Sequence, residues 1–302
     1  MTKPASDRPP VDVLIPTFRR PTALAITLAG LVSQSYRPLR VIVSDQTEDE
    51  PIPSRSPEVE GVVRVLDGVG CVVERHRHVP PRGMAEHRQS LLDRARAPYA
   101  LFLDDDVLLE HNLIERLVRA IRRADCGFVG SALVGLSYRG DVRPHEEAIE
   151  FWDDGVRREL ITTDGAAWPR HRLHNAANLR HLQERLGPTE DRLYKVAWVG
   201  GCVLYDVAKL RATGGFRFWR RLPVRHAGED VLAQQQVMAR FGGAGLFPSG
   251  AYHLELPTTI DDRRVDAPRV LSPSRAQGTV RRRHGMKRRR TRAARSRDAT
   301  TR

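Results

Sequence analysis

The sequence is poor in aromatic and sulfur-containing side chains and has no long apolar run. Aromatic residues make up 6% of the 302 positions, and no apolar run reaches the roughly 18 residues of a membrane-spanning helix. Cys71, Cys126 and Cys202 lie far apart and form no C-x-x-C pair. These absences argue against a membrane-spanning protein, a zinc framework or a disulfide scaffold, and they favour reduced thiols in a cytoplasmic protein. The first ten residues lack the apolar segment of a secretory signal.

Outside its C-terminal end, the sequence also lacks any excess of one charge. Residues 263–302 hold 15 Lys and Arg against two Asp, which accounts for the whole net charge of +13. The first 262 residues hold 35 basic and 35 acidic side chains. We therefore expect a neutral globular body between a flexible N-terminus, residues 1–10, and a disordered Arg-rich tail, residues 263–302.

Strand-like and helix-like segments alternate along residues 11–134. This alternation predicts an α/β protein with one large domain, in which helices flank a mostly parallel central sheet. In such sheets, ligands bind beyond the carboxyl ends of the strands. The expected strands are 11–16, 39–45, 61–67 and 99–104, and the expected helices begin at Pro21 and cover 83–97 and 113–121.

The second half of the chain, residues 135–262, is less regular. Residues 135–195 are rich in Arg, His, Asp and Trp, and only a helix near 176–186 is expected there. Regular patterns return with a strand and short helix in 195–210, a helix over 230–241 and a strand around 250–256.

Three consecutive carboxylates, Asp104, Asp105 and Asp106, follow directly on an apolar run in LFLDDDV. Asp45 also stands at the end of a predicted strand, so the sheet brings all four acids to one edge. Such a cluster suits Mg²⁺ or Mn²⁺, which take few protein carboxylates and complete their shell with water and phosphate oxygens. The alternative remains open that Asp104 caps the next helix and its neighbours are solvated turn residues.

Six segments occur in the order typical of one enzyme family. In sequence they are VLIPTFRRPTALAITLAGLVSQSY, VIVSDQT, RGMAEHRQSLLDRA, YALFLDDDV, WVGGCVLYDVAKLRATGGF and GEDVLAQQQVMARFGG. Over residues 11–256 the chain resembles family 2 glycosyltransferases, which have the GT-A nucleotide-sugar fold. The resemblance implies a metal-dependent enzyme that transfers one sugar from a nucleoside diphosphate, most often UDP, to a hydroxyl acceptor.

The resemblance also assigns roles at the donor site. Thr17 and Asp45 match positions that hold the base and ribose, and Arg88 matches an arginine near the nucleotide. Asp104 would face the ribose and Asp106 the metal, Mn²⁺ or Mg²⁺, with Asp105 between them. Gln89 and Leu91 replace the family's usual Asn and Gly, which leaves the base preference of this segment open. Taken singly, these residues are also ordinary turn caps and solvated charges.

Later segments supply the remaining assignments. Trp198, Gly200 and Gly201 match a segment that lines the donor-sugar pocket, although a buried aromatic and close-packed glycines explain them equally well. His253 matches the position of an additional metal ligand in several GT-A enzymes. A structural role for His253 stays open.

The GED segment places Glu229 and Asp230 in the first turn of a predicted helix, where the helix dipole favours carboxylates. In the family's acceptor-side motif, the Asp would be the general base that accepts the proton of the attacking hydroxyl. A direct displacement with inversion follows if Asp230 is only a base, although the family also includes retaining members. Glu229 would orient the acceptor. The resemblance thus implies that residues 11–134 bind the nucleotide sugar and that residues 135–262 bind the acceptor and carry the base.

Other functions remain as alternatives. The basic tail suits nucleic acid or an anionic membrane, but no aromatics interleave with its arginines, so we do not expect base stacking. Peripheral contact with the inner face of a membrane would suit a lipid-linked acceptor; glycans and small molecules are equally open. A sugar-nucleotide pyrophosphorylase is disfavoured because IPTFRRPTAL contains no glycine. Five side chains of the irregular stretch are expected to be solvated loop residues, with contact to the acceptor as the alternative: His145, Trp152, Trp168, His171 and His174.

Overall fold

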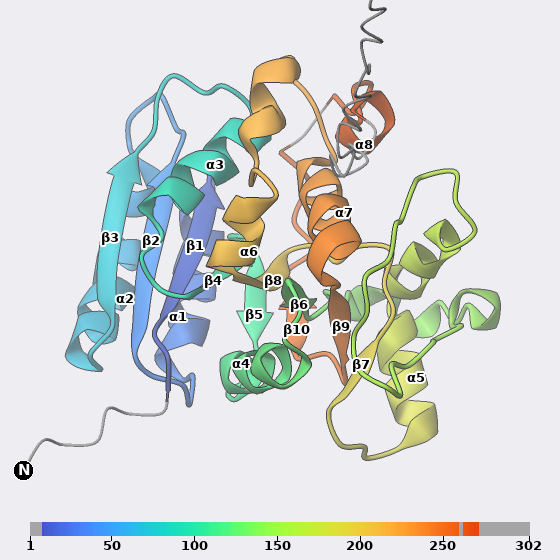
Figure 1. Ribbon diagram of the computed structural model, residues 1–302. Coiled ribbons are helices and arrows are strands. Elements are labelled where there is room, and N and C mark those ends of the chain that lie inside the picture. The colour runs from blue at the N-terminus through green and yellow to red at the C-terminus, as the bar shows by residue number, and fades with distance from the viewer. Residues whose placement is uncertain (1–7, 260–261, 272–302) are drawn as a thin grey trace, which may run out of the picture.

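An eight-stranded sheet forms the centre of the protein in the computed structural model, which describes residues 8–259 and 262–271 (Figure 1). The strand order is β3-β2-β1-β4-β8-β6-β9-β7, and β8 and β7 run against the other six. The expected α/β fold with a mostly parallel sheet is therefore confirmed. The strands are β1 (Val11–Thr17), β2 (Leu39–Asp45), β3 (Val72–Arg77), β4 (Tyr99–Leu103), β6 (Phe128–Gly130), β7 (Arg192–Tyr194), β8 (Cys202–Asp206) and β9 (Ala244–Phe247).

Helices cover both faces of this sheet. Along β1, Val13 and Ile15 belong to one buried apolar cluster and Leu14 to another, because successive side chains of a strand point to opposite faces. Helices α1, α2 and α4 pack on the first cluster and α3, α6 and α7 on the second (Figure 1). The helices are α1 (Pro21–Val32), α2 (Pro57–Gly68), α3 (Met84–Arg94), α4 (Leu113–Ala124), α5 (Asn178–Leu186), α6 (Val207–Ala212), α7 (Glu229–Phe241) and α8 (Ala267–Val270).

The parallel register brings several strand ends to one edge. Thr17 pairs with Asp45 at the carboxyl ends of β1 and β2, and β4 runs parallel to β1 on its other side. A separate two-stranded sheet joins β5 (Val107–Leu109) to β10 (Ala251–His253), with His253 opposite Val107. This pairing places His253 next to the end of the Asp104–Asp106 turn, because Val107 is the residue that follows Asp106.

One strand prediction was wrong. Residues 61–67 lie inside α2, and the third strand in the chain is β3. Pro57 begins the helix after Ser56, and Val59 and Leu66 are buried seven residues apart, on the same face of a helix. The valines between Val59 and Leu66 indicate a strand only if Pro57, which marks the start of the helix, is ignored.

The ordered part of the chain also extends beyond the predicted boundary at residue 262. Asp266 and Ala227 form an isolated parallel β-bridge. Helix α8 packs on α7, and Ala267 and Leu271 are buried. Residues 272–302, which hold most of the basic tail, lie outside the described residues. Residues 263–271, expected to belong to a disordered tail, therefore include folded structure.

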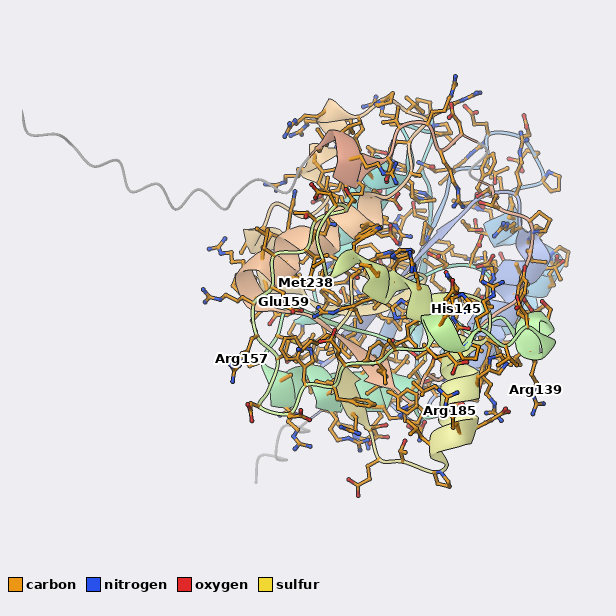
Figure 2. All side chains as sticks on the ribbon, turned by 90° about the vertical axis from the view of Figure 1, so that its right-hand side faces the viewer. Arg139, His145, Arg157, Glu159, Arg185 and Met238 are labelled. Carbon is orange, nitrogen blue, oxygen red and sulfur yellow. The ribbon has the colours of Figure 1, made fainter. Side chains whose placement is uncertain are left out.

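The irregular stretch after β6 forms one side of the molecule (Figure 2). It contains α5, found close to its predicted place, and the short 3₁₀ helices Leu136–Gly140, Pro144–Glu146 and Trp168–His174. Glu159 lies beside Met238 of α7, with its backbone N–H 3.2 Å from the Met238 carbonyl oxygen (Figure 2). Two further 3₁₀ helices are Pro53–Arg55 and Arg217–Arg221. No helix within 8–259 and 262–271 is long and apolar enough to cross a membrane.

Candidate active site

A cavity of about 290 Å³ opens at the carboxyl edge of β1 and β4. Six of the ten residues predicted for the donor and metal sites line it: Thr17, Arg88, Asp104, Asp105, Asp106 and His253. Glu229, predicted for the acceptor side, also lines it, together with Arg20, Gln46, His87, Leu256 and Arg263 among others. The structure therefore brings segments from six places in the sequence to one site.

A close backbone approach fixes the start of the Asp104–Asp106 turn. The Asp104 backbone N–H donates to the Gly201 carbonyl oxygen at 2.9 Å. Gly201 has a φ of +69°, and a Cβ there would collide with the Leu133 side chain and lie 3.3 Å from Asp104 Oδ2. Gly201 is thus needed for the shape of the turn, and it supports Asp104 through its backbone.

Arg88 of α3 joins two acidic segments. Its Nη2 lies 3.0 Å from Asp104 Oδ1 and its Nε lies 2.9 Å from Glu229 Oε1. The Arg88 side chain is only 8% exposed. Burial alone would lower the pKa of Arg88, but Asp104, Glu229 and Asp230 raise it above its usual value, so the guanidinium stays charged. The pair of charge-assisted hydrogen bonds holds the two carboxylates in a fixed relation.

Asp105 points to the end of β1. Its Oδ2 accepts a hydrogen bond from Thr17 Oγ1 at 2.6 Å. Burial raises the pKa of Asp105 to about 6, although this hydrogen bond opposes the change. Thr17 and Asp105 therefore hold each other in place in the wall of the cavity.

Asp106 is held by two cationic or donor side chains. Its Oδ2 lies 2.7 Å from Arg20 Nη1 and 3.4 Å from His253 Nε2. Burial acts to raise the pKa of Asp106, but the hydrogen bond with His253 and the charge of Arg20 hold it below the usual value. Asp106 is therefore an ionised carboxylate with His253 within reach of the same oxygen.

This arrangement fits a divalent cation in part. Asp106 Oδ2 and His253 Nε2 are close enough to contact one ion, as expected for a cation that takes two protein ligands. The His253 Nδ1, however, accepts the Glu255 backbone N–H at 3.2 Å, so the hydrogen of the neutral ring is on Nε2. His253 can ligate through Nε2 only after this hydrogen moves. Within 8–259 and 262–271, no group of three His, Cys, Asp or Glu side chains converges on one point.

Asp230 lies in the first turn of α7, directly after Glu229 and Gly228, which has a φ of +75°. Its Oδ1 accepts the Val231 backbone N–H at 2.8 Å. Burial, with the neighbouring charge of Glu229, raises the pKa of Asp230 to about 7. A carboxylate with this pKa can accept a proton near neutral pH. Asp230 is not among the residues that line the cavity, and it stands one residue behind Glu229.

Asp45 does not line the cavity either. It is fully buried, and its two carboxylate oxygens accept the backbone N–H groups of Thr47 and Ser54, each at 2.9 Å. This places Asp45 as the anchor of the loop after β2. The next residue, Gln46, lines the cavity instead.

Sequence reasoning missed six polar residues of the cavity: Arg20, Gln46, His87, Thr258, Thr259 and Arg263. Arg20, Gln46 and His87 lie within three positions of a predicted residue, which was the only available signal for them. His87 Nε2 lies 3.0 Å from the Ser44 carbonyl oxygen, and burial lowers the pKa of His87 to about 3. His87 is therefore a neutral ring whose Nε2 donates to that carbonyl.

A second cavity, of about 380 Å³, adjoins the first. Trp198 and Gly200 line it, and His253 and Leu256 belong to the walls of both cavities. A Cβ on Gly200 would lie 3.0 Å from the Trp198 ring, so the glycine leaves this ring room. Of the five aromatic and histidine residues expected in loops, only His174 lines this second cavity, whereas His145 is exposed.

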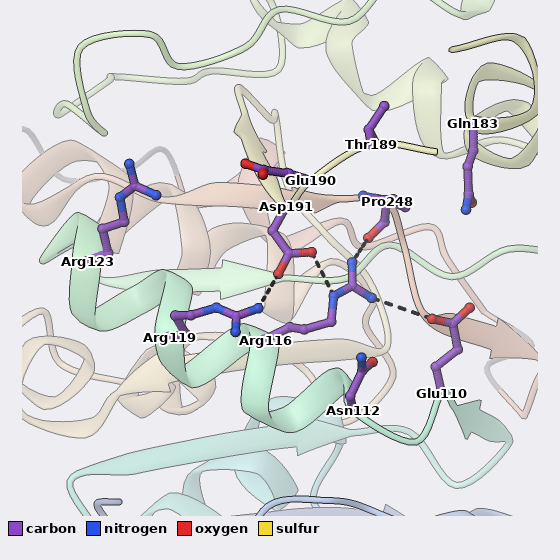
Figure 3. A pocket seen from close by; sticks show the side chains of 10 residues that line it. All are labelled: Glu110, Asn112, Arg116, Arg119, Arg123, Gln183, Thr189, Glu190, Asp191 and Pro248. Atoms are coloured by element: carbon purple, nitrogen blue, oxygen red, sulfur yellow. Dashed lines mark hydrogen bonds and ion pairs between the residues drawn. The ribbon is translucent and has the colours of Figure 1, made fainter. Parts of the chain in front are cut away.

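A cavity of about 510 Å³ beside α4 is lined by residues that connect this helix to neighbouring segments (Figure 3). Asp191 Oδ1 accepts from Arg116 Nε at 2.8 Å and Oδ2 accepts from Arg119 Nη2 at 2.7 Å. Arg116 Nη2 also donates to the Pro248 carbonyl oxygen at 2.6 Å. These contacts tie α4 to the segments before β7 and β10, and the acid and arginines satisfy each other. The carboxylate-lined cavity is therefore the better candidate site.

Comparison with known proteins identifies the family and the fold. The family model described as "Glycosyl transferase family 2" matches residues 12–177, more than half of the chain. A curated relative is the GalNAc(5)-diNAcBac-PP-undecaprenol beta-1,3-glucosyltransferase of Campylobacter jejuni. It is 24% identical over 126 residues, which cover 42% of this chain and 39% of the relative. The chain thus spans well under half of that protein's length.

Solved structures share the fold. S. aureus TarS 1-349 superposes with a TM-score of 0.52 at 13% identity, covering 85% of this chain and 60% of that one. The mannosyltransferase PcManGT from Pyrobaculum calidifontis, in complex with GDP-Man and Mn²⁺, gives a TM-score of 0.52 at 15% identity. It covers 84% of this chain and 59% of that one. At these identities the likeness establishes the fold, and it confirms the expected GT-A architecture.

Proposed function

This chain belongs to glycosyltransferase family 2, and we propose that it transfers one sugar from a nucleoside-diphosphate sugar to a hydroxyl acceptor. The observation that carries the proposal is the position of Arg88, which joins the Asp104 carboxylate to Glu229. The donor-side and acceptor-side motifs therefore meet in one cavity. A nucleic-acid-associated protein or a pyrophosphorylase would not require Asp104 and Glu229 to share one cavity.

The donor's nucleoside would lie over the end of β1. Thr17, Gln46 and His87 line that part of the cavity, and Arg88 and Asp104 stand next to it. We propose that Gln46, in place of Asp45, contacts the base of the nucleotide, because the Asp45 carboxylate already accepts two backbone hydrogen bonds from the loop after β2. The solved structures of TarS hold UDP and UDP-GlcNAc and that of PcManGT holds GDP-Man, which supports a nucleotide-sugar donor. UDP is our first choice of nucleotide.

A divalent cation, Mn²⁺ or Mg²⁺, would be held by Asp106 and, once its Nε2 is free, by His253. When bound, such a cation neutralises charge on the departing diphosphate. The Mn²⁺ in the PcManGT structure supports this assignment. Asp105 would hold Thr17 in place in the wall of the site.

Asp230 would act as general base. The acceptor oxygen forms a bond to the anomeric carbon, and the bond between this carbon and the diphosphate oxygen breaks. The leaving nucleoside diphosphate keeps the electron pair of that bond, and the hydroxyl proton passes to Asp230. Direct displacement of this kind inverts the configuration of the anomeric carbon. Glu229, fixed by Arg88, would orient the acceptor.

The second cavity would take a sugar ring. Trp198 and Gly200, both lining it, would contact the donor sugar, while Gly201 shapes the turn below. Residues 11–134 would then bind mostly donor and residues 135–262 mostly acceptor. The Campylobacter relative's name describes an undecaprenol-linked substrate, so a lipid-linked sugar is our first choice of acceptor. A cytoplasmic enzyme that works beside a membrane would suit that choice, and its basic tail would add attraction to anionic lipid.

A thermal-shift panel of nucleoside diphosphates, each with and without Mn²⁺, tests this function. We expect one nucleotide, UDP first, to raise Tm by several degrees, and more with Mn²⁺ than without. Asp106→Asn should remove the metal-dependent part of the increase, and Asp191→Asn, far from the site, should leave it unchanged. A panel without any stabilising nucleotide would contradict the proposal.

A further inference from the structure

Asp106 Oδ2 has two partners on the side where a cation would bind. Arg20 Nη1 lies 2.7 Å from this oxygen and His253 Nε2 lies 3.4 Å from it. Arg20 Nη1 is also 3.4 Å from Asp105 Oδ1. A guanidinium thus already neutralises the oxygen that we assign to the divalent cation, and both positive charges cannot occupy the same space.

The segment after β10 holds both of these partners. The Pro257 carbonyl oxygen accepts a hydrogen bond from Arg20 Nη2, and the Glu255 backbone N–H donates to His253 Nδ1. Glu255 has a φ of +58°, an unfavourable conformation for a residue with a side chain. Its carboxylate is fixed in turn by the Ser137 hydroxyl and backbone N–H. Residues 255–257 therefore keep Arg20 on Asp106 and the hydrogen of His253 on Nε2.

The position of Arg20 in the helix is also unusual. Arg20 is the N-cap residue of α1, and its side chain makes no cap hydrogen bond. A cation at a helix N-terminus is disfavoured by the helix dipole, and arginine is not among the preferred N-cap residues. The side chain is nevertheless only 16% exposed, because it reaches into the carboxylate cluster. The attraction of Asp105 and Asp106 explains this placement.

We propose that Arg20 and residues 255–257 form a latch that competes with the divalent cation for Asp106. Metal binding displaces Arg20 from Asp106 and frees His253 from the Glu255 N–H. The displaced guanidinium then binds the donor's diphosphate, since its planar fork suits phosphate oxygens. The inference rests on the proposed function, and it adds that metal and donor bind together because one releases the arginine that the other requires.

The test measures Mn²⁺ affinity without nucleotide and needs no enzyme turnover. Free Mn²⁺ is followed by electron paramagnetic resonance in titrations of the full chain and of Arg20→Gln. We expect Arg20→Gln to bind Mn²⁺ about tenfold more tightly, because a competing buried cation has been removed. With saturating Mn²⁺, the same variant should bind UDP about tenfold more weakly, because the diphosphate loses its guanidinium.

Arg19→Gln is the matched control. Arg19 is the preceding residue, is largely exposed, and pairs with Asp49 outside the cavity. This variant loses the same charge and should change neither affinity. Arg20→Lys serves if Arg20→Gln does not fold: its shorter side chain keeps the charge but cannot reach both Asp106 and Pro257, so Mn²⁺ affinity should rise by a smaller factor.

The outcomes separate the latch from the proposed function. Equal Mn²⁺ affinity in the wild type and in Arg20→Gln would overturn the latch, while a loss of that affinity in Asp106→Asn would leave the metal site standing. If UDP stabilises the protein but neither the wild type nor Arg20→Gln binds Mn²⁺, the metal assignment and the latch both fail. A rise in Mn²⁺ affinity in Arg19→Gln as large as that in Arg20→Gln would also overturn the latch, because general charge would then explain the effect.

Discussion

Arg88 and Glu229 lie 141 positions apart in the sequence, yet the Arg88 Nε is 2.9 Å from the Glu229 Oε1 and both side chains are almost fully buried. With Asp104 as the second partner, this contact connects the turn after β4 to the start of α7. A change at Arg88 should therefore affect both folding and the geometry of the acceptor side.

Replacing Arg88 with Gln should lower the free energy of unfolding by about 3 kcal/mol, because it leaves buried carboxylates without their cation. Urea denaturation followed by circular dichroism measures this loss. Arg94→Gln, on the same helix, removes a hydrogen bond to the neutral Ser90 carbonyl oxygen and should cost much less. Equal midpoints for the two variants would show that Arg88 does not hold the site together.

Asp230→Asn should reduce the rate of sugar transfer by about 10²–10⁴-fold, because the attacking hydroxyl loses its proton acceptor. Binding of the nucleotide should stay within about twofold of the wild-type value, since Asp230 does not line the donor cavity. Transfer is measured by release of nucleoside diphosphate and binding by calorimetry. Near wild-type turnover by Asp230→Asn would mean that another group takes the proton.

The pH profile follows from the same residue. Because burial raises the pKa of Asp230 to about 7, the proton-accepting form is lost as the pH falls through neutrality. We expect kcat/KM to be constant above pH 8 and to fall about tenfold for each unit below about pH 6. A profile that stays flat down to pH 5 would indicate a base with an ordinary carboxylate pKa. Measurements with saturating donor keep its binding from shaping the curve.

Asp45 and Gln46 should respond differently to substitution. Asp45→Asn keeps the shape but weakens two buried hydrogen bonds, so it should cost about 2 kcal/mol of stability and change nucleotide affinity little. Gln46→Ala should weaken nucleotide binding several-fold and leave the urea midpoint nearly unchanged. The reverse pattern would restore Asp45 as the residue that contacts the donor.

The sequence was sufficient to predict which strands end at the site. Parallel strands have their carboxyl ends at one edge, so Thr17 and Asp104–Asp106 meet as expected. It was not sufficient to choose between Asp45 and Gln46, because neighbouring residues at a strand end point in opposite directions. The backbone N–H groups of Thr47 and Ser54 bind the Asp45 carboxylate, which leaves Gln46 to line the cavity.

Arg20 shows a different limit of sequence reasoning. In TFRRP, Arg19 and Arg20 look equivalent, yet the first faces solvent and pairs with Asp49 while the second contacts Asp106. The direction of each side chain depends on the positive φ of Arg19, 57°, and on the distant Pro257 carbonyl. Neither local spacing nor composition records such long-range partners. The same holds for residues 263–271, whose order depends on contact with α7.

His253 and Leu256 form a common wall between the two cavities of the site. An occupant that shifts this wall from one side reshapes the other side, and by reciprocity each occupant changes the other's affinity by the same factor. The nucleotide part of the donor would lie on one side of this partition and its sugar on the other, so the affinity for the nucleoside diphosphate and the preference for the sugar would not be independent properties of the enzyme.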